Sequence, residues 1–141
     1  MRSKATAVTR FLLDTNVCIE YLRQRDASVI AAFNSHRPMD LLLSSVVVAE
    51  LCYGASKSVA PAKNLQLVKH LTQVLSVLPF GKDAAVVYGE IRADLERRGV
   101  PIGPYDMMIA ASALADGLTL VTHNTKEFER IAGLQISDWH S

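Results

Sequence analysis

The segment Phe11-Leu12-Leu13-Asp14-Thr15-Asn16-Val17 decides the fold, because three apolar residues end at an acid and a stretch with helical spacing follows at once. The apolar triplet predicts a short buried strand at residues 11–13. The apolar positions after it predict a helix over residues 16–23. A strand that leads directly into a helix is typical of α/β domains.

The rest of the chain repeats this alternation. Strands are predicted at 41–43, 118–121 and 134–136, with a brief strand or extended connection at 77–80. Helices are predicted at 28–34, 46–53 (ending at Gly54), 62–75, 83–98, 106–115 and 127–131. Short apolar strands separated by helices predict a parallel sheet that is covered on both faces.

The composition indicates one soluble domain over residues 1–141, since 50% of the residues are hydrophobic and 21% are charged. No stretch approaches the roughly 18 apolar residues of a membrane-spanning helix. The net charge of +1 excludes a general polyanion-binding surface. Residues 1–10 carry three positive charges, but the apolar run that follows them, residues 11–13, is too short for a signal peptide. Cys18 and Cys52 have no metal or disulfide spacing, so we expect a cytoplasmic protein.

Three acidic residues are candidates for a common site. Asp14 follows the first predicted strand, where ligands of parallel sheets gather, although Asp is also a common helix N-cap. Glu50 falls on the face of its helix that should point inward, so it needs a cation, a proton or an ion pair with Arg92 or Lys57. Asp106 opens a buried helix, where N-capping is again the alternative.

A further polar group, Thr122, Asn124 and Glu127, follows the strand at 118–121. Oxygen ligands without cysteine favour Mg²⁺ or Mn²⁺ over zinc. The chain lacks GxSxG, GxxxxGK[ST] and GxGxxG patterns, which argues against a serine hydrolase and against phosphate-binding loops. The histidines are scattered along the sequence, and we expect surface or packing roles for each of them: His36, His70, His123 and His140.

Four segments resemble the PIN-domain ribonucleases, and more narrowly the VapC toxins of bacterial toxin–antitoxin pairs. They are residues 11–17, 48–54, 101–110 and 121–128, and the closing residues 133–139 also look like the end of such toxins. The resemblance implies a three-layer α/β/α sandwich with a mainly parallel sheet. It also implies Mg²⁺- or Mn²⁺-dependent cleavage of RNA, a homodimer, and an antitoxin protein that blocks the site. A structured RNA such as tRNA is the expected substrate.

The resemblance also assigns the site residues. Asp14, Glu50 and Asp106 match the family's three main acidic positions, as metal ligands and catalytic residues. Many PIN domains carry Asp where this chain has Asn124, so we assign the fourth acid to Glu127. Asn124 then becomes a neutral ligand or a substrate contact. For Asn16 and Thr122 we expect contacts to the acids or to phosphate.

Two other functions stay open from the sequence. Asp14 follows a strand much as the nucleophile of a phosphoaspartyl phosphatase or receiver domain does, although Asn16 stands where the hydrolase pattern needs a second Asp. A PIN-fold binding module that has lost catalysis is the other alternative. For RNA binding, cations are expected on the rim of an acidic cleft, and the candidates are Arg23, Arg25, Arg97 and Arg98.

Overall fold

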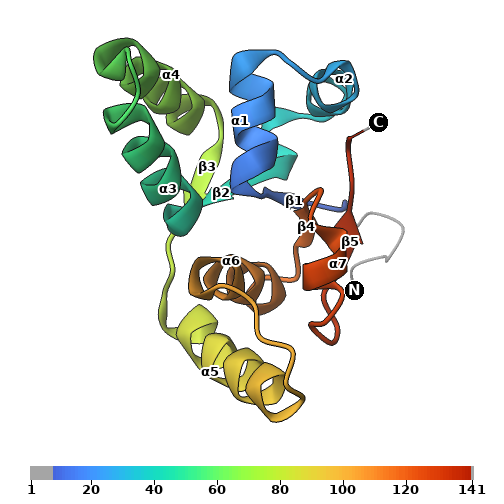
Figure 1. Ribbon diagram of the computed structural model, residues 1–141. Coiled ribbons are helices and arrows are strands. Elements are labelled where there is room, and N and C mark those ends of the chain that lie inside the picture. The colour runs from blue at the N-terminus through green and yellow to red at the C-terminus, as the bar shows by residue number, and fades with distance from the viewer. Residues whose placement is uncertain (1–7, 141) are drawn as a thin grey trace.

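The computed structural model describes residues 8–140, which form a five-stranded sheet with helices on both faces (Figure 1). The strands are β1 (Phe11–Leu13), β2 (Leu41–Ser44), β3 (Ser76–Leu78), β4 (Thr119–Val121) and β5 (Ile136–Ser137). Every neighbouring pair is parallel, and the order across the sheet is β3-β2-β1-β4-β5. The predicted α/β sandwich with a parallel sheet is confirmed.

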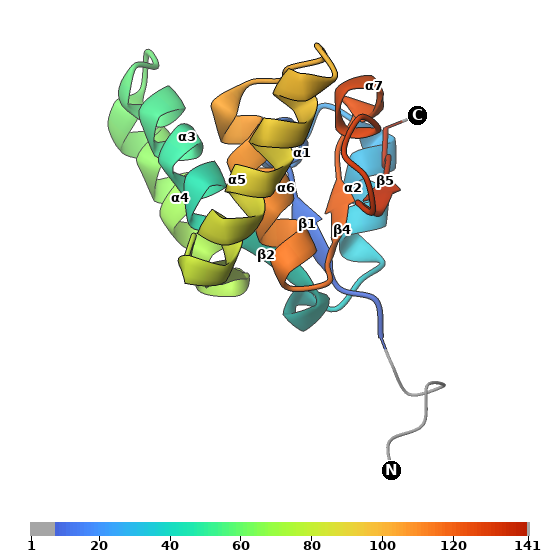
Figure 2. The ribbon, with the colours of Figure 1, turned by 90° about the horizontal axis from the view of Figure 1, so that it is seen from below.

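The helices form the two outer layers. One face of the sheet carries α1 (Thr15–Arg23), α2 (Ala27–Asn34), α3 (Ser45–Ser56) and α4 (Pro61–Val74). The other face carries α5 (Lys82–Arg97) and α6 (Pro104–Ala115), which lie in front of the strands in Figure 2. A 3₁₀ turn (Pro38–Asp40) precedes β2, and the short α7 (Thr125–Phe128) follows β4.

The core lies between these layers, and the sequence pattern explains why. Leu12, Leu13 and Leu43 of the central strands have no exposed surface, as expected of a parallel sheet covered on both faces. Helix α6 is apolar nearly all round, and its buried stretch includes Ile109 and Ala110. Such a helix is stable only inside a protein, so α6 lies between the sheet and α5.

Several predicted boundaries are wrong. The third helix does not end at Gly54 but runs through it to Ser56, because Gly54 keeps a helical backbone and faces open space. The sixth helix starts at Pro104 rather than Asp106, with Gly103 at the N-cap position. Proline suits the first turn of a helix because its missing N–H has no partner there in any case.

The order of the strands determines where a ligand site is expected, at the carboxyl ends of the two strands on either side of the reversal. The chain runs outward from β1 to β2 and β3, then returns to the other side of β1 for β4 and β5. The carboxyl ends of β1 and β4 therefore mark the point where the winding direction reverses, which is where open α/β sheets bind ligands. None of the described helices is long and apolar enough to cross a membrane. The single domain over residues 1–141 stays a prediction.

Candidate active site

Asp14 lies at the reversal point, directly after β1. Its Oδ1 accepts a hydrogen bond from the Thr15 backbone N–H (2.8 Å), and its Oδ2 accepts one from the Thr122 hydroxyl (2.8 Å). The N-cap role is therefore confirmed, but the same carboxylate also joins β1 to the end of β4. Burial raises the pKa of Asp14, the two hydrogen bonds oppose this shift, and the charge of Glu50 adds to it.

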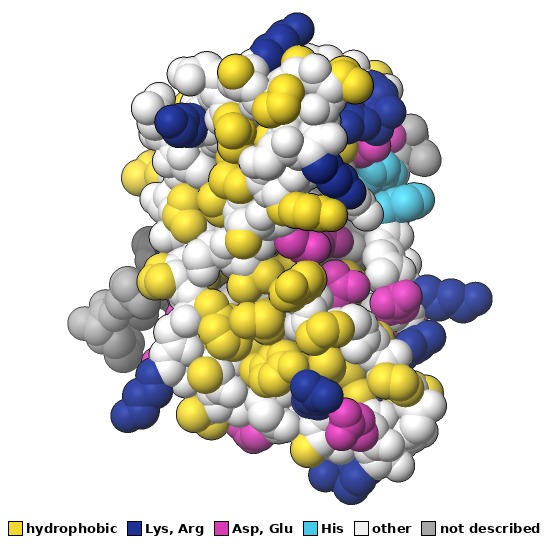
Figure 3. All heavy atoms as spheres, turned by 60° about the vertical axis from the view of Figure 1, so that its left-hand side comes forward, with side chains coloured by type: hydrophobic (Ala, Val, Ile, Leu, Met, Phe, Trp, Pro, Cys, Tyr) yellow, Lys and Arg dark blue, Asp and Glu magenta, His cyan; other side chains and the backbone are white. Residues whose placement is uncertain are grey.

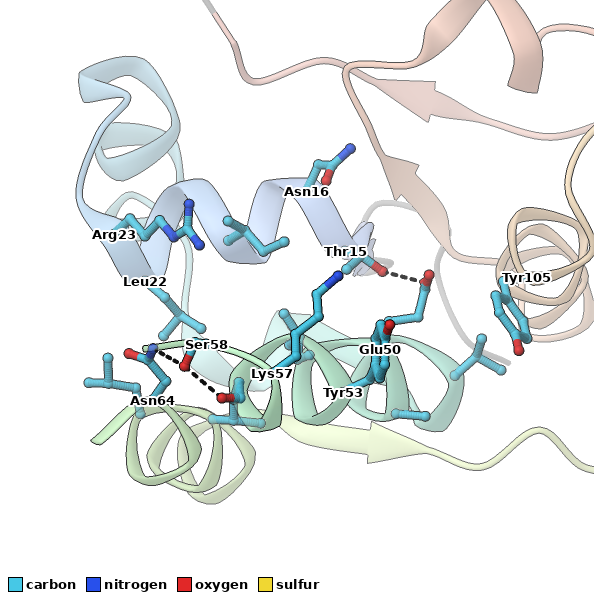
Figure 4. A pocket seen from close by; sticks show the side chains of 18 residues that line it. Thr15, Asn16, Leu22, Arg23, Glu50, Tyr53, Lys57, Ser58, Asn64 and Tyr105 are labelled. Carbon is cyan, nitrogen blue, oxygen red and sulfur yellow. Dashed lines mark hydrogen bonds between the residues drawn. The ribbon is translucent and has the colours of Figure 1, made fainter. Parts of the chain in front are cut away.

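Glu50 lies on α3 at the border between core and surface, so the expectation that it points into the core is wrong. It is half-buried, and its Oε1 accepts a hydrogen bond from the Thr15 hydroxyl (2.7 Å; Figure 4). Neither expected ion-pair partner reaches it: Arg92 pairs along its own helix, and Lys57 lies over the Tyr53 ring. Among residues 8–140, Glu50 has no basic partner within 4.0 Å.

Asp106 occupies the first turn of α6, so it is not the N-cap of that helix. Burial raises its pKa to about 6, and the negative charges of Asp14, Glu127 and Glu50 add to the shift. A helix N-terminus favours a negative charge nearby. The pKa nevertheless rises, so burial and repulsion exceed the effect of the helix dipole. The other three predicted acids therefore lie close enough to Asp106 for their charges to affect its pKa.

The other predicted residues lie around these acids. Thr122 is fully buried, and its hydroxyl accepts a hydrogen bond from the Asn124 backbone N–H (3.0 Å) while donating to Asp14. Asn124 precedes α7 without a side-chain capping bond, and Glu127 lies half-buried in the first turn of that helix. Asn16 is exposed at the start of α1. The structure thus brings together the site residues from four separate segments.

The donor set suits a hard divalent cation. The four acids offer carboxylate oxygens, with the Asn124 amide as a neutral addition, and these are the ligands that Mg²⁺ and Mn²⁺ prefer. Within the described part of the chain, no three of the acids place their oxygens within 4.8 Å of one another. Water molecules or small side-chain movements are therefore needed to join them around one ion.

A groove of about 770 Å³ leads away from Glu50 between α1, α3 and α4 (Figure 4). Its walls are mostly apolar, from residues such as Leu22 and Val68, while Arg23 and Lys57 add positive charge. Figure 3 shows acidic side chains in the middle of one face of the molecule, with apolar side chains above and below them.

Sequence reasoning missed several residues around Glu50. They are Thr15, which holds Glu50, and the groove residues Tyr53 and Tyr105. The sequence does contain a signal for Thr15, because it lies between two candidate site residues, Asp14 and Asn16. Its hydroxyl belongs to the first turn of α1, next to the N-cap residue Asp14. The two tyrosines have no such signal in the sequence, where each stands as a single aromatic residue. Both are exposed in the structure.

Most of the predicted rim cations are engaged elsewhere. Arg25 pairs with Glu20 (3.2 Å), and both Arg97 and Arg98 pair with Asp94 on α5. These contacts support the alternative in which such arginines stabilise helix ends and surfaces. Arg23 is the member of the set that lines the groove beside the acids.

Comparison with known proteins agrees with this geometry. The family model for the PIN domain matches residues 11–134. The tRNA(fMet)-specific endonuclease VapC of Salmonella typhimurium is 45% identical over 130 residues, which cover 92% of this chain and 98% of that protein. Ribonuclease VapC2 of Haemophilus influenzae is 36% identical over the same shares of the two chains.

Solved structures give the same result. A chain in the crystal structure of DNA-bound VapBC from Salmonella typhimurium superposes with a TM-score of 0.88 and 44% identity, covering 94% of this chain and 99% of that one. A chain of VapBC2 from Rickettsia felis, bound to a promoter DNA fragment, gives a TM-score of 0.86 at 34% identity, covering 93% and 99%. The match extends over nearly the whole length of both chains. The chain therefore belongs to the PIN domain family and, within it, to the VapC proteins.

Proposed function

We propose that this protein is the toxin of a toxin–antitoxin pair and acts as an endoribonuclease that depends on Mg²⁺ or Mn²⁺. The observation that carries the proposal is the placement of four acids without a cation. The hydroxyls of Thr122 and Thr15 hold Asp14 and Glu50. Among the described residues, no basic side chain pairs with these two acids or with Asp106 and Glu127, and the charges of the other three acids help to raise the pKa of Asp106. Such an arrangement destabilises the folded protein unless a cation binds there. Its relatives are named as ribonucleases, and one of them as a tRNA-specific endonuclease.

Asp14, Glu50 and Asp106 would hold the ion, directly or through water, and Glu127 would complete the site. When bound, Mg²⁺ or Mn²⁺ supplies an activated water and offsets the charge that develops on the phosphoryl oxygens. The protein contributes the orientation of the acids. Thr122 donates a hydrogen bond to one oxygen of Asp14, and Thr15 donates one to Glu50, so both carboxylates keep fixed directions.

Neutral and basic side chains would receive the RNA backbone, which four acids alone would repel. Asn16 and Asn124 carry amide groups beside the acids and would donate hydrogen bonds to phosphate oxygens. Arg23 and Lys57 lie along the groove and would bind phosphates further along the strand. A structured RNA such as tRNA is the proposed substrate, in agreement with the tRNA(fMet)-specific endonuclease of Salmonella typhimurium.

The groove itself would bind the antitoxin. Its apolar walls are larger than phosphate contacts require, and it opens beside Glu50, so a peptide bound there would also cover the acids. The structural neighbours are VapBC assemblies, in which a VapC-type chain is paired with a second protein. We place the complex in the cytoplasm, and the homodimer implied by the family resemblance is part of the same proposal.

The phosphoaspartyl alternative is disfavoured by the surroundings of Asp14. Both of its oxygens accept hydrogen bonds, and only 6% of its surface is exposed. These bonds leave lone pairs for a cation, but a phosphoaspartyl hydrolase also needs a second Asp, and Asn16 stands at that position. The catalytically silent binding module would keep the same fold, so only an activity measurement separates it from the proposed enzyme.

The test is cleavage of RNA by the purified protein, with RNA ends sequenced after brief induction in cells. We expect cuts at a small number of positions in a structured RNA, activity with Mn²⁺ or Mg²⁺, and none in excess EDTA. Co-expression with the neighbouring small gene should restore growth through a tight complex. Unchanged RNA and normal growth after induction without the partner would contradict the proposal.

A further inference from the structure

A second cluster of side chains that can bind a metal lies outside the region of Asp14, Glu50, Asp106 and Glu127, which we call the acidic cleft. His123, Asp138 and His140 place one potential ligand atom each within 4.8 Å of one another. This cluster could not be predicted from the sequence, because 14 residues separate His123 from Asp138. The sheet creates it: β4 and β5 pair in parallel with Val121 opposite Ser137, so the residues after both strands emerge side by side.

The contacts within the cluster are short. His123 Nδ1 lies 3.0 Å from Asp138 Oδ2, and His140 Nδ1 lies 3.3 Å from Asp138 Oδ1. The ring centroids of the two histidines are 4.3 Å apart. Ligands bound tetrahedrally to zinc at about 2.0 to 2.1 Å lie roughly 3.3 Å from one another. The two nitrogen–oxygen distances are close to this spacing, although they end on different oxygens of Asp138. The exposed His123 ring can turn to bring both imidazoles to one ion.

The His140 ring gives independent evidence for a missing ligand. Only 12% of its side chain is exposed, and its Nδ1 is buried without a hydrogen-bond partner among the described residues. The nearby Asp138 oxygen is close enough for a charge contact but lacks hydrogen-bond geometry. A buried polar atom without a partner is costly. Here a bound cation would satisfy it.

The cluster is held in place by the chain around it. Trp139 is buried, with its ring stacked on His36 (centroids 5.2 Å apart) and edge-on to Phe11 (5.7 Å), so the C-terminal segment is fixed against β1. The His140 backbone N–H donates a hydrogen bond to Asp138 Oδ1 (3.0 Å). Burial opposes ionisation of Asp138, but this bond and the contact with His123 keep its pKa below the usual value.

We propose that His123, Asp138 and His140 form a binding site for Zn²⁺ or a similar transition-metal ion, separate from the acidic cleft. Two imidazoles and one carboxylate are zinc ligands, whereas the cleft offers only oxygen ligands. Zinc there ties the C-terminal segment to the loop after β4. That loop contains Thr122, which donates a hydrogen bond to Asp14, so the ion links the C-terminal segment to a residue that supports the acids.

Calorimetric titration of the whole protein with Zn²⁺ tests the proposal. We expect one ion per chain and a higher melting temperature with zinc. His123→Asn should weaken the binding at least about tenfold, the lower end of the loss seen even for groups that only support a ligand. It should also abolish the zinc-dependent shift in melting temperature. His123 is 63% exposed, so this variant should fold. His140→Asn should give the same loss, with circular dichroism to verify its fold.

Two controls locate the ion. His70→Ala removes an exposed histidine on α4 and should leave zinc binding unchanged. Glu50→Gln alters the cleft and should also leave it unchanged, so the result does not depend on the proposed nuclease activity. The proposal is overturned if the wild-type protein binds no zinc, if His123→Asn binds it as tightly as wild type, or if Glu50→Gln removes the binding.

Discussion

Two carboxylates on the same face of the sheet have pKa values shifted in opposite directions. Asp94 on α5 lies between Arg97 and Arg98, and its hydrogen bonds with Arg98 keep its pKa low. Asp106 on the neighbouring α6 has no basic partner within 4.0 Å among the described residues, and burial and three like charges raise its pKa to about 6. Arginine therefore stabilises a surface helix end at Asp94, while the cleft keeps its acids unpaired at a cost in stability. This contrast supports the proposal that the cleft is the functional region.

The largest expected effect is the loss of activity in Glu50→Gln. The amide keeps the volume and the acceptor oxygen for Thr15 but removes the charge, so the fold should persist while RNA cleavage falls by orders of magnitude. The matched control is Glu96→Gln, which alters a surface acid paired with Arg92 and should leave the rate unchanged. Cleavage rates with Mg²⁺ measure both. A near-wild-type rate in Glu50→Gln would show that Glu50 is not a ligand.

The second test separates Glu127 from Asn124. Because the charge of Glu127 contributes to the raised pKa of Asp106, Glu127→Gln should raise the Mn²⁺ concentration for half-maximal cleavage and lower the maximal rate. Asn124→Ala should mainly weaken RNA binding, by the roughly 0.5 to 1.5 kcal/mol of one hydrogen bond. Metal titrations and RNA-binding assays distinguish the two. Reversed phenotypes would assign the fourth ligand to Asn124.

The third test compares the stability of Asp106→Asn and Asp94→Asn without metal. Between pH about 4 and 6, folded Asp106 keeps a proton that the unfolded chain releases, so its contribution lowers the free energy of unfolding as pH rises. In EDTA at pH 7, Asp106→Asn should therefore melt a few degrees above wild type, and the difference should vanish near pH 4. Asp94→Asn should melt slightly lower or unchanged at pH 7. A lower melting temperature for Asp106→Asn at pH 7 would contradict the repulsion.

The smallest effect is expected for Thr15→Val. The change removes the 2.7 Å hydrogen bond to Glu50 while keeping the shape of the side chain. One such bond contributes about 0.5 to 1.5 kcal/mol, which corresponds to roughly a two- to tenfold lower rate. Kinetics over a range of Mn²⁺ concentrations provide the measurement. A loss as large as that of Glu50→Gln would make Thr15 part of the catalytic machinery itself.

The pattern of apolar residues along the sequence was sufficient to predict most of the strands and helices. The apolar triplet at 11–13 and the run at 41–43 predicted buried strands, and both form inner strands of the sheet. Helix ends were less predictable because they depend on their surroundings. Gly54 resembles a stop signal in sequence, but it stays helical because α3 continues along α4. Pro104 starts α6 two residues before the predicted start, since a proline fits there without loss of a hydrogen bond.

The candidate site was predictable where acids follow strands or open helices, as Asp14 and Asp106 do. The partners of these acids were not predictable, because they come from distant segments. The Thr15 hydroxyl reaches Glu50 across 35 positions of the chain, and Thr122 reaches Asp14 across 108. His123 and His140 looked scattered for the same reason, since only the register between β4 and β5 brings them together.

The bond between Thr122 and Asp14 has a consequence for synthesis of the protein. When the first hundred residues have been translated, Asp14 and Glu50 are already part of the chain, but neither Asp106 nor Thr122, which follows β4, has been added. Strand β4 must then insert beside β1, against residues made long before. The nascent chain therefore lacks a complete acid cluster until Asp106 and Thr122 have been translated. The proposed nuclease activity would not begin before that stage of synthesis.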